Sequence, residues 1–256
     1  MIFKPKIIAF VCSWCLPPEV DITTPSLIRG YPKVRIVQVM CAGRIDPTIA
    51  LETFLRGADG VLVVGCETPD CHYVEGNMQA DRKVKMLKRL MALTGLDPER
   101  LRLEWASASS IETFAGIINA FRNQVASLGT SPLISKADSS ILLNVSAAKA
   151  VVENFTLRVL AGREKGLTGD TNVYGERLSQ KEFDNLMEET IEAEFIRHKI
   201  RLLTVGKPMS VKQIAAVAGM EPSLTLCHVV NMRRKGMITL DHVEGTTPFY
   251  KALEVG

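Results

Sequence analysis

Short apolar runs that end at a cysteine constrain the fold of this chain more than any other feature of its sequence. Three runs do so, the last with Gly65 in between: Lys6–Val11 before Cys12, Val34–Met40 before Cys41, and Val61–Val64 before Cys66. Short runs rich in Val and Ile, bounded by Gly, Pro and polar residues, predict strands that are buried on both faces. A fourth run, Leu101–Trp105, predicts a further strand.

Helix signals alternate with these strands. Asp46-Pro47 predicts a helix start that leads to Arg56, because Asp caps and Pro suits the first helical position. Further helices are predicted over Pro25–Ile28, from Asn77 to about Thr94, and from a capping box at Ser109–Glu112 to about Leu128. Strands that alternate with helices predict an α/β fold, a parallel sheet with flanking helices. Ligands bind such sheets at the carboxyl ends of the strands, so the cysteines are expected to meet there.

The character of the sequence changes after Gly129. We expect three parts: an α/β domain over 1–130, a helical linker region over 131–196 and a winged-helix domain over 197–256. In the linker region, a helix is predicted over 137–162, a loop over 162–177 and a long helix after the capping box Ser179–Glu182. In the last part, two helices and two strands in this order are typical of a winged helix: Ser210–Ala218, Ser223–Lys235, Met237–Asp241 and Phe249–Leu253.

Five of the six cysteines lie in the first 71 residues, with the spacing Cys12-x2-Cys15, Cys41, Cys66-x4-Cys71. This set is too small and too clustered for a disulfide scaffold. Thiolates suit an iron–sulfur cluster, whereas structural zinc sites typically use two C-x2-C pairs and this chain has one. Burial as small apolar residues is the remaining alternative for these side chains. The sixth, Cys227, is expected to pack in the core of the last domain.

The composition bounds the class of protein. The chain has 256 residues, 46% of them hydrophobic and 23% charged, with a net charge of +3, which by itself favours no nucleic-acid partner. No apolar run approaches the length of a membrane span, and the N-terminus has Lys4 and Lys6 but no cleavage site. These features predict a cytoplasmic protein whose thiols stay reduced or bind metal.

Several separated motifs resemble one family. CSWC, VMCAGRIDP, GADGVLVVGC and CHYVEGN, followed by Arg82, resemble the small iron–sulfur (delta) subunit of methyl-viologen-reducing hydrogenase over about residues 5–130. Relatives of that subunit accompany heterodisulfide reductases. The resemblance implies a 2Fe–2S cluster and an electron relay. The expected partners are the flavin-containing subunit of a heterodisulfide-reductase-like complex and a hydrogenase or other dehydrogenase subunit.

The resemblance also implies which residues bind the cluster. The ligands are expected from Cys12, Cys15, Cys41, Cys66 and Cys71, with one of the five spare. Trp14, His72, Asn77 and Arg82 lie inside or beside the shared motifs. For His72, a hydrogen bond to a sulfur and simple packing in the loop are both open. Arg82 is expected either to face a negative charge or to lie on a solvated helix.

Motifs for other chemistry are missing. The first strand is not followed by G-x-G-x-x-G, and no paired carboxylates or Ser/His/Asp set stands out. We therefore expect an oxidoreductase subunit that relays electrons and has no substrate site of its own.

The winged helix leaves a second hypothesis, a redox- or metal-responsive DNA-binding regulator. A recognition helix would present Ser223–Leu226 to the bases, a weak set for base contacts. Residues 197–256 carry 9 Lys+Arg against 4 Asp+Glu, a mild positive charge for a DNA-binding domain. Protein docking is favoured, and nucleic acid is not expected as a partner.

Overall fold

The computed structural model describes residues 3–18, 20, 33–135 and 139–253. The chain forms two compact units, Met1–Glu153 and Asn154–Gly256. The helix predicted over Pro25–Ile28 lies outside the described residues, and the domain boundaries predicted near residues 130 and 196 stay predictions.

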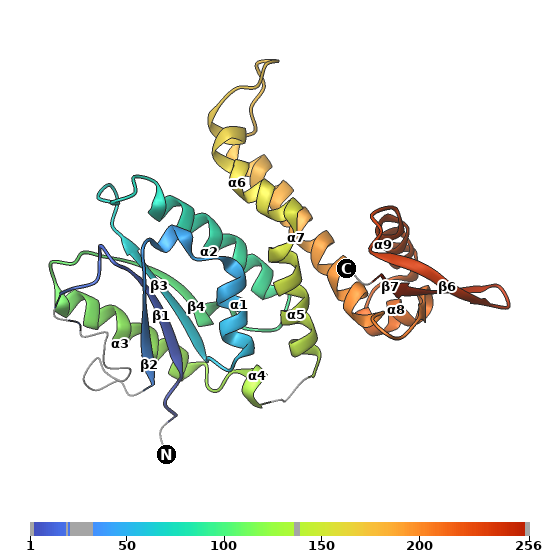
Figure 1. The fold of residues 1–256 in the computed structure, drawn as a ribbon, viewed down its shortest axis with the longest axis horizontal. Helices are drawn as coiled ribbons and strands as arrows, with labels where there is room; N and C mark the ends of the chain where they lie inside the picture. The colour runs from blue at the N-terminus through green and yellow to red at the C-terminus, as the bar shows by residue number, and fades with distance from the viewer. Residues whose placement is uncertain (1–2, 19, 21–32, 136–138, 254–256) are drawn as a thin grey trace. The chain divides into compact units, whose positions relative to one another are not determined.

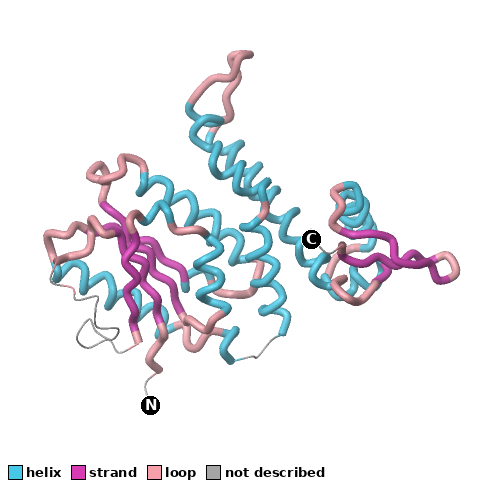
Figure 2. The backbone as a smooth tube through the Cα atoms, in the orientation of Figure 1, coloured by secondary structure: helices cyan, strands magenta, loops and turns pink. Residues whose placement is uncertain are grey.

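The first unit is built around a parallel sheet (Figures 1 and 2). Its strands lie in the order β2-β1-β3-β4, with the bounds Val34–Val39 (β2), Ile7–Cys12 (β1), Gly60–Cys66 (β3) and Leu101–Ala106 (β4). Every residue of β3 is buried, as expected for a central strand with helices on both faces. The predicted α/β fold with a parallel sheet is confirmed.

Helices cover both faces of this sheet. α1 (Pro47–Leu55) and α2 (Gly76–Ala92) lie on one side and α3 (Ile111–Ser127) on the other (Figure 1). A Cβ at Gly60 would approach a methyl group of Val125 to 2.7 Å, so glycine allows α3 to pack directly on β3. Two short 3-10 helices, Ala42–Arg44 (η1) and Pro98–Arg100 (η2), and the helices Pro132–Ser135 (α4) and Ser139–Glu153 (α5) complete the unit.

Of two predicted helix starts in this unit, one is confirmed and the other is displaced by one residue. The Asp46 carboxylate accepts the amide of Thr48 at 2.9 Å, with Pro47 at the first helical position, as expected. The predicted box at Ser109–Glu112 is wrong by one residue, because Ser110 is the cap and accepts the amide of Thr113 at 3.2 Å. The Ser109 hydroxyl instead lies 2.9 Å from the Ser107 hydroxyl in the preceding turn.

The second unit combines helices with a small antiparallel sheet (Figure 1). Its elements are α6 (Phe155–Gly169), α7 (Gln180–Leu203), β5 (Met209–Ser210), α8 (Val211–Ala218), α9 (Pro222–Arg234), β6 (Ile238–Glu244) and β7 (Thr247–Ala252). The sheet order is β5-β7-β6. The capping box Ser179–Glu182 is present at the start of α7. None of the described helices combines the length and the apolar composition that a membrane span requires.

Three predictions for the region after Gly129 need correction. The single helix predicted over 137–162 is two helices, because the Asn154 side chain caps α6 by accepting the amide of Thr156 at 2.8 Å. The loop predicted from Gly162 starts later, because α6 continues to Gly169 and packs on α7. Cys227 is exposed on α9 and does not lie in the core, which Val229 and Met232 of the same helix help to form.

A buried carboxylate ties three helices of this unit together. The Glu194 side chain on α7 is 2% exposed and accepts hydrogen bonds from Arg197 at 2.6 Å and Lys235 at 3.0 Å. It also accepts one from Asn154 at 3.3 Å, and the same amide lies 3.2 Å from Nε2 of His198. Burial alone would raise the pKa of Glu194, but Lys235 and Arg197 outweigh burial and hold the pKa below its usual value.

Candidate metal centre

Two adjacent strands bring two of the sulfurs together. β1 and β3 run parallel with Val11 opposite Val64, and each strand ends at a cysteine. The Sγ atoms of Cys12 and Cys66 lie 3.6 Å apart. The turn after β1 returns Cys15 to the same place, and its thiol donates to the carbonyl of Val64 at 3.6 Å. The three sulfurs of Cys12, Cys15 and Cys66 all lie within 4.8 Å of one another.

The other two cysteines meet at the start of α2. Cys41 precedes η1 and Cys71 lies in the loop before α2. A Cβ at Gly76, the first residue of α2, would lie 3.2 Å from Cys71 Sγ and closer still to Cys41 Sγ. Because the Cys12 sulfur lies 3.6 Å from the carbonyl oxygen of Met40, next to Cys41, the two groups of sulfurs share one edge of the sheet. All five cysteines are buried.

Gly76→Ala tests this close approach. The added methyl group would overlap the Cys41 sulfur, so we expect a loss of about 1–3 kcal/mol in stability and a lower iron content after reconstitution. Gly116→Ala on α3 is the control, because a Cβ there meets nothing within 4 Å and alanine favours a helix. Thermal melting and iron analysis of both variants check the prediction, and equal iron content in the two variants would contradict it.

The thiols differ in how readily they ionise. The pKa of Cys12 falls from 9.0 to about 5, chiefly because the Cys15 side chain hydrogen-bonds to it. The same contact raises the pKa of Cys15. Burial raises the pKa of Cys66 to about 11 and also raises that of Cys41. One thiolate at Cys12 thus faces neighbours that keep their protons, and a bound metal would displace these protons.

Backbone amides also point at the sulfurs. The amides of Trp14 and Ala42 hydrogen-bond to Cys12 and lower its pKa, and the amide of His72 does the same at Cys66. Amides of Gly43 and Arg44 act in this way on Cys41. Hydrogen bonds to sulfur are one of the means by which proteins set the reduction potential of an iron–sulfur cluster. Five buried thiols, three of which accept hydrogen bonds from backbone amides, are a donor set that fits such a cluster.

The side chains of Trp14 and His72 connect two of the cysteine loops. Their rings stack with centroids 3.4 Å apart and planes 13° apart. Of the two roles left open for His72, the structure shows packing, with the backbone amide supplying the contact to a sulfur. The stack therefore holds together the two residues whose amides face Cys12 and Cys66.

Trp14→Ala is expected to lower the reduction potential of the reconstituted cluster. Loss of the stack would loosen the amides of Trp14 and His72, and fewer hydrogen bonds to sulfur disfavour the reduced state. His72→Phe keeps a ring for stacking and should leave the potential near that of the wild type. An EPR-monitored redox titration compares the two variants. An unchanged potential in Trp14→Ala would contradict the role of the stack.

Two other residues of the shared motifs are placed by α2. Asn77 is buried, and its amide donates to the carbonyl of Cys66 at 3.4 Å and to the hydroxyl of Thr68 at 3.1 Å. Asn77 thereby fixes the loop that leaves β3 against the start of α2. Arg82 lies further along α2 and is half-buried.

Known proteins match the first unit. The family model described as "Methyl-viologen-reducing hydrogenase, delta subunit" matches residues 7–129. The iron-sulfur subunit of the F420-non-reducing hydrogenase of Archaeoglobus profundus is 39% identical over 127 residues, which is 50% of this chain and 93% of that protein. The iron-sulfur subunit of the vhc F420-non-reducing hydrogenase of Methanococcus voltae is 38% identical over 131 residues, 51% of this chain and 91% of that protein.

The same region also matches part of a larger protein. One subunit of the ferredoxin/F(420)H(2)-dependent CoB-CoM heterodisulfide reductase of Methanosarcina acetivorans is 42% identical over 125 residues, or 49% of this chain. The matched region spans only 16% of the length of that reductase polypeptide. The matches with small subunits, in contrast, cover nearly their whole length. The chain therefore belongs to the family of the methyl-viologen-reducing hydrogenase delta subunit.

Proposed function

We propose that this chain carries a 2Fe–2S cluster and passes electrons between a hydrogenase or other dehydrogenase and the flavin-containing subunit of a heterodisulfide-reductase-like complex. The observation that carries the proposal is the grouping of Cys12, Cys15 and Cys66 within 4.8 Å at one edge of the sheet. Cys41 and Cys71 are the other candidate ligands. The relatives named iron-sulfur subunits support the type of cofactor.

The residues around this edge would hold a redox group. A thiolate-bound cluster supplies one-electron transfer. Cys12 and Cys66 would hold the cluster from the ends of β1 and β3, and the burial of all five cysteines limits access of water. The amides of Trp14, Ala42 and His72 supply hydrogen bonds that stabilise negative charge on sulfur.

Exposed apolar side chains surround the cysteine loops. Each of them is at least 40% exposed, and they are Trp14, Met40, Tyr73, Val74 and Met78. Grouped exposed apolar side chains mark protein contacts. This edge therefore suits contact with a protein electron partner better than binding of a small polar substrate.

For the second unit we infer a winged helix that serves protein docking. The order of α8, α9, β6 and β7 supports this assignment. The exposed side of α9 carries Leu224, Leu226 and Val230, each more than 40% exposed, where a DNA-recognition helix needs polar side chains. The relatives are named as hydrogenase and reductase subunits, and these names give a DNA-binding regulator no support.

Electron transfer with purified partners tests this function. The chain is reconstituted anaerobically and mixed with a hydrogenase under hydrogen, and its visible absorbance is followed. We expect bleaching that requires the hydrogenase, and flavin reduction in an added heterodisulfide-reductase-like flavin subunit only when the chain is present. Flavin reduction at the same rate without the chain would overturn the relay.

A further inference from the structure

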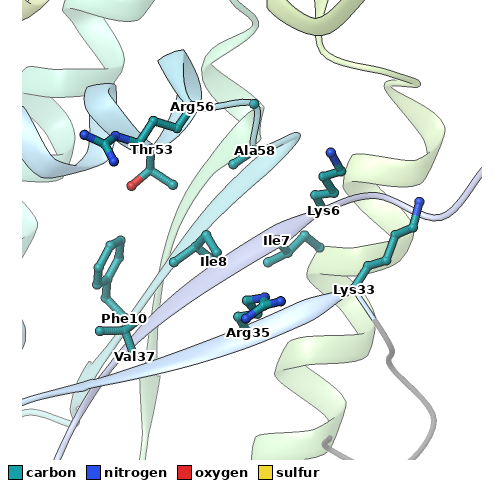
Figure 3. Close-up of a pocket in the computed structure, with 11 residues that line it drawn as sticks. Lys6, Ile7, Ile8, Phe10, Lys33, Arg35, Val37, Thr53, Arg56 and Ala58 are labelled. Carbon is teal, nitrogen blue, oxygen red and sulfur yellow. The ribbon is translucent and has the colours of Figure 1, made fainter. Parts of the chain in front are cut away.

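A second surface feature of the first unit lies beside α1. A groove of about 500 Å³ runs between α1 and the strands β1 and β2 (Figure 3). Its floor is apolar and comes from Ile8 and Phe10 of β1 and Val37 of β2. Ile8 pairs with Arg35 and Phe10 with Val37, so these four side chains share one face of the sheet.

The described residues leave this part of the sheet incompletely covered. β2 is an edge strand, and Arg35 and Val37 are exposed on the face that carries the floor. Val37 is 41% exposed. Parallel sheets are normally covered on both faces. An apolar element placed here would complete the cover and gain the free energy of burying this surface.

The rim of the groove is positively charged. It carries Lys6, Lys33, Arg35 and Arg56, and none of the described residues that line it is acidic. Arg56 pairs with Glu52 at 2.7 Å. Within the described part of the chain, no ion pair engages the side chains of the other three. A ligand that fits this groove therefore combines apolar with acidic groups.

We propose that the groove binds an acidic, amphipathic segment of the heterodisulfide-reductase-like flavin subunit, an inference that rests on the proposed electron-relay function. In the heterodisulfide reductase relatives, the region that matches this chain is only 16% of a longer polypeptide. An open groove beside an edge strand suits a chain segment. The groove runs from Lys33 and Ala58, at the starts of the strands, as far as Phe10 and Val37, and none of the five N-terminal cysteines lines it.

Substitutions in β2 test whether the groove binds the flavin subunit. The probe is the purified heterodisulfide-reductase-like flavin subunit, whose binding to the full cluster-loaded chain is measured by interferometry at two salt concentrations. Val37→Asp places a charge on the apolar floor, and Arg35→Glu reverses a charge on the rim. Gln38→Glu is the matched control, because Gln38 is exposed on the opposite face of the same strand.

We expect Val37→Asp to weaken binding by about tenfold or more, and Arg35→Glu to weaken it and to reduce its salt dependence. Gln38→Glu should bind like the wild type, and all three should keep their iron. If Val37→Asp binds the flavin subunit as tightly as the wild type does, the groove is not the binding site, and the proposed electron relay is unaffected. Absence of any wild-type binding would overturn both. A wild-type dimer that Val37→Asp converts to a monomer would show that a second copy is the occupant and would also overturn the proposal.

Discussion

Cys66→Ser is expected to abolish assembly of the iron–sulfur cluster. Cys66 lies 3.6 Å from Cys12 at the end of the central strand, where its sulfur is held between two cysteine loops. A serine hydroxyl is a hard, weakly acidic ligand, whereas iron–sulfur clusters require thiolates. Cys12→Ser should have the same effect for the same reason.

A complete serine scan makes this prediction quantitative. Each of the five N-terminal cysteines is replaced in turn, and iron, sulfide and the visible spectrum are measured after anaerobic reconstitution. Because a 2Fe–2S cluster takes four protein ligands, four variants should lose the cluster and one should keep it. Cys227→Ser is the control, since this cysteine is exposed on α9 in the second unit. Retention of the cluster in either Cys12→Ser or Cys66→Ser would contradict the assignment of these two ligands.

Glu194→Ala is expected to destabilise the second unit strongly. Removal of the carboxylate leaves Arg197, Lys235 and Asn154 without their common acceptor. Loss of one partner from a buried charged pair costs about 3–5 kcal/mol, and the partial exposure of Lys235 reduces the expected loss to about 2–4 kcal/mol. Glu192→Ala on the exposed side of the same helix should change stability little.

Urea unfolding of the full chain measures this loss. Both tryptophans, Trp14 and Trp105, belong to the first unit, so tryptophan fluorescence serves as an internal reference. Both units contain helices, so Glu194→Ala should shift only the part of the circular dichroism transition that belongs to the second unit and leave the fluorescence transition in place. Equal shifts in Glu194→Ala and Glu192→Ala would argue against a central role for the buried carboxylate.

The buried titratable groups near Glu194 predict that the second unit loses stability in acid. Burial lowers the pKa of His198 and of His228 below 6.5 in the folded chain. As the pH falls through 6.5, the unfolded chain therefore binds more protons than the folded chain does. The contribution of the two neutral histidines to the free energy of unfolding is complete above about pH 6.5 and decreases below it. The pKa of Glu194 lies below 4.5, so its contribution is lost only at still lower pH. Urea midpoints from pH 8 to pH 4 check this order.

Local sequence signals were sufficient to predict the strands of the parallel sheet and several helix starts. The apolar runs gave β1 and β3, and with them the proximity of Cys12 and Cys66, because parallel strands that pair in register end at the same edge. Side chains that act within three residues, as in the capping box of Ser179 and Glu182, were also predictable. Where two local caps competed, as at Ser109 and Ser110, the sequence could not decide between them.

Interactions between distant residues could not be predicted in this way. The ring stack joins Trp14 to His72, and the guanidinium of Arg100 donates to the carbonyls of Leu128 and Gly129 at 2.9 and 3.0 Å. These partners come together only when the sheet and its helices have formed. The buried Glu194 had no signal in the sequence either, since acidic residues on a long helix are usually exposed.

The proposed 2Fe–2S cluster is tested most directly by analysis of the anaerobically purified wild-type chain for metal and sulfide, with EPR of the reduced protein. We expect roughly two iron and two acid-labile sulfide per chain, with the EPR signal of a reduced 2Fe–2S cluster. Zinc bound without sulfide would overturn the proposed relay, because a zinc site of thiolates has no role in electron transfer.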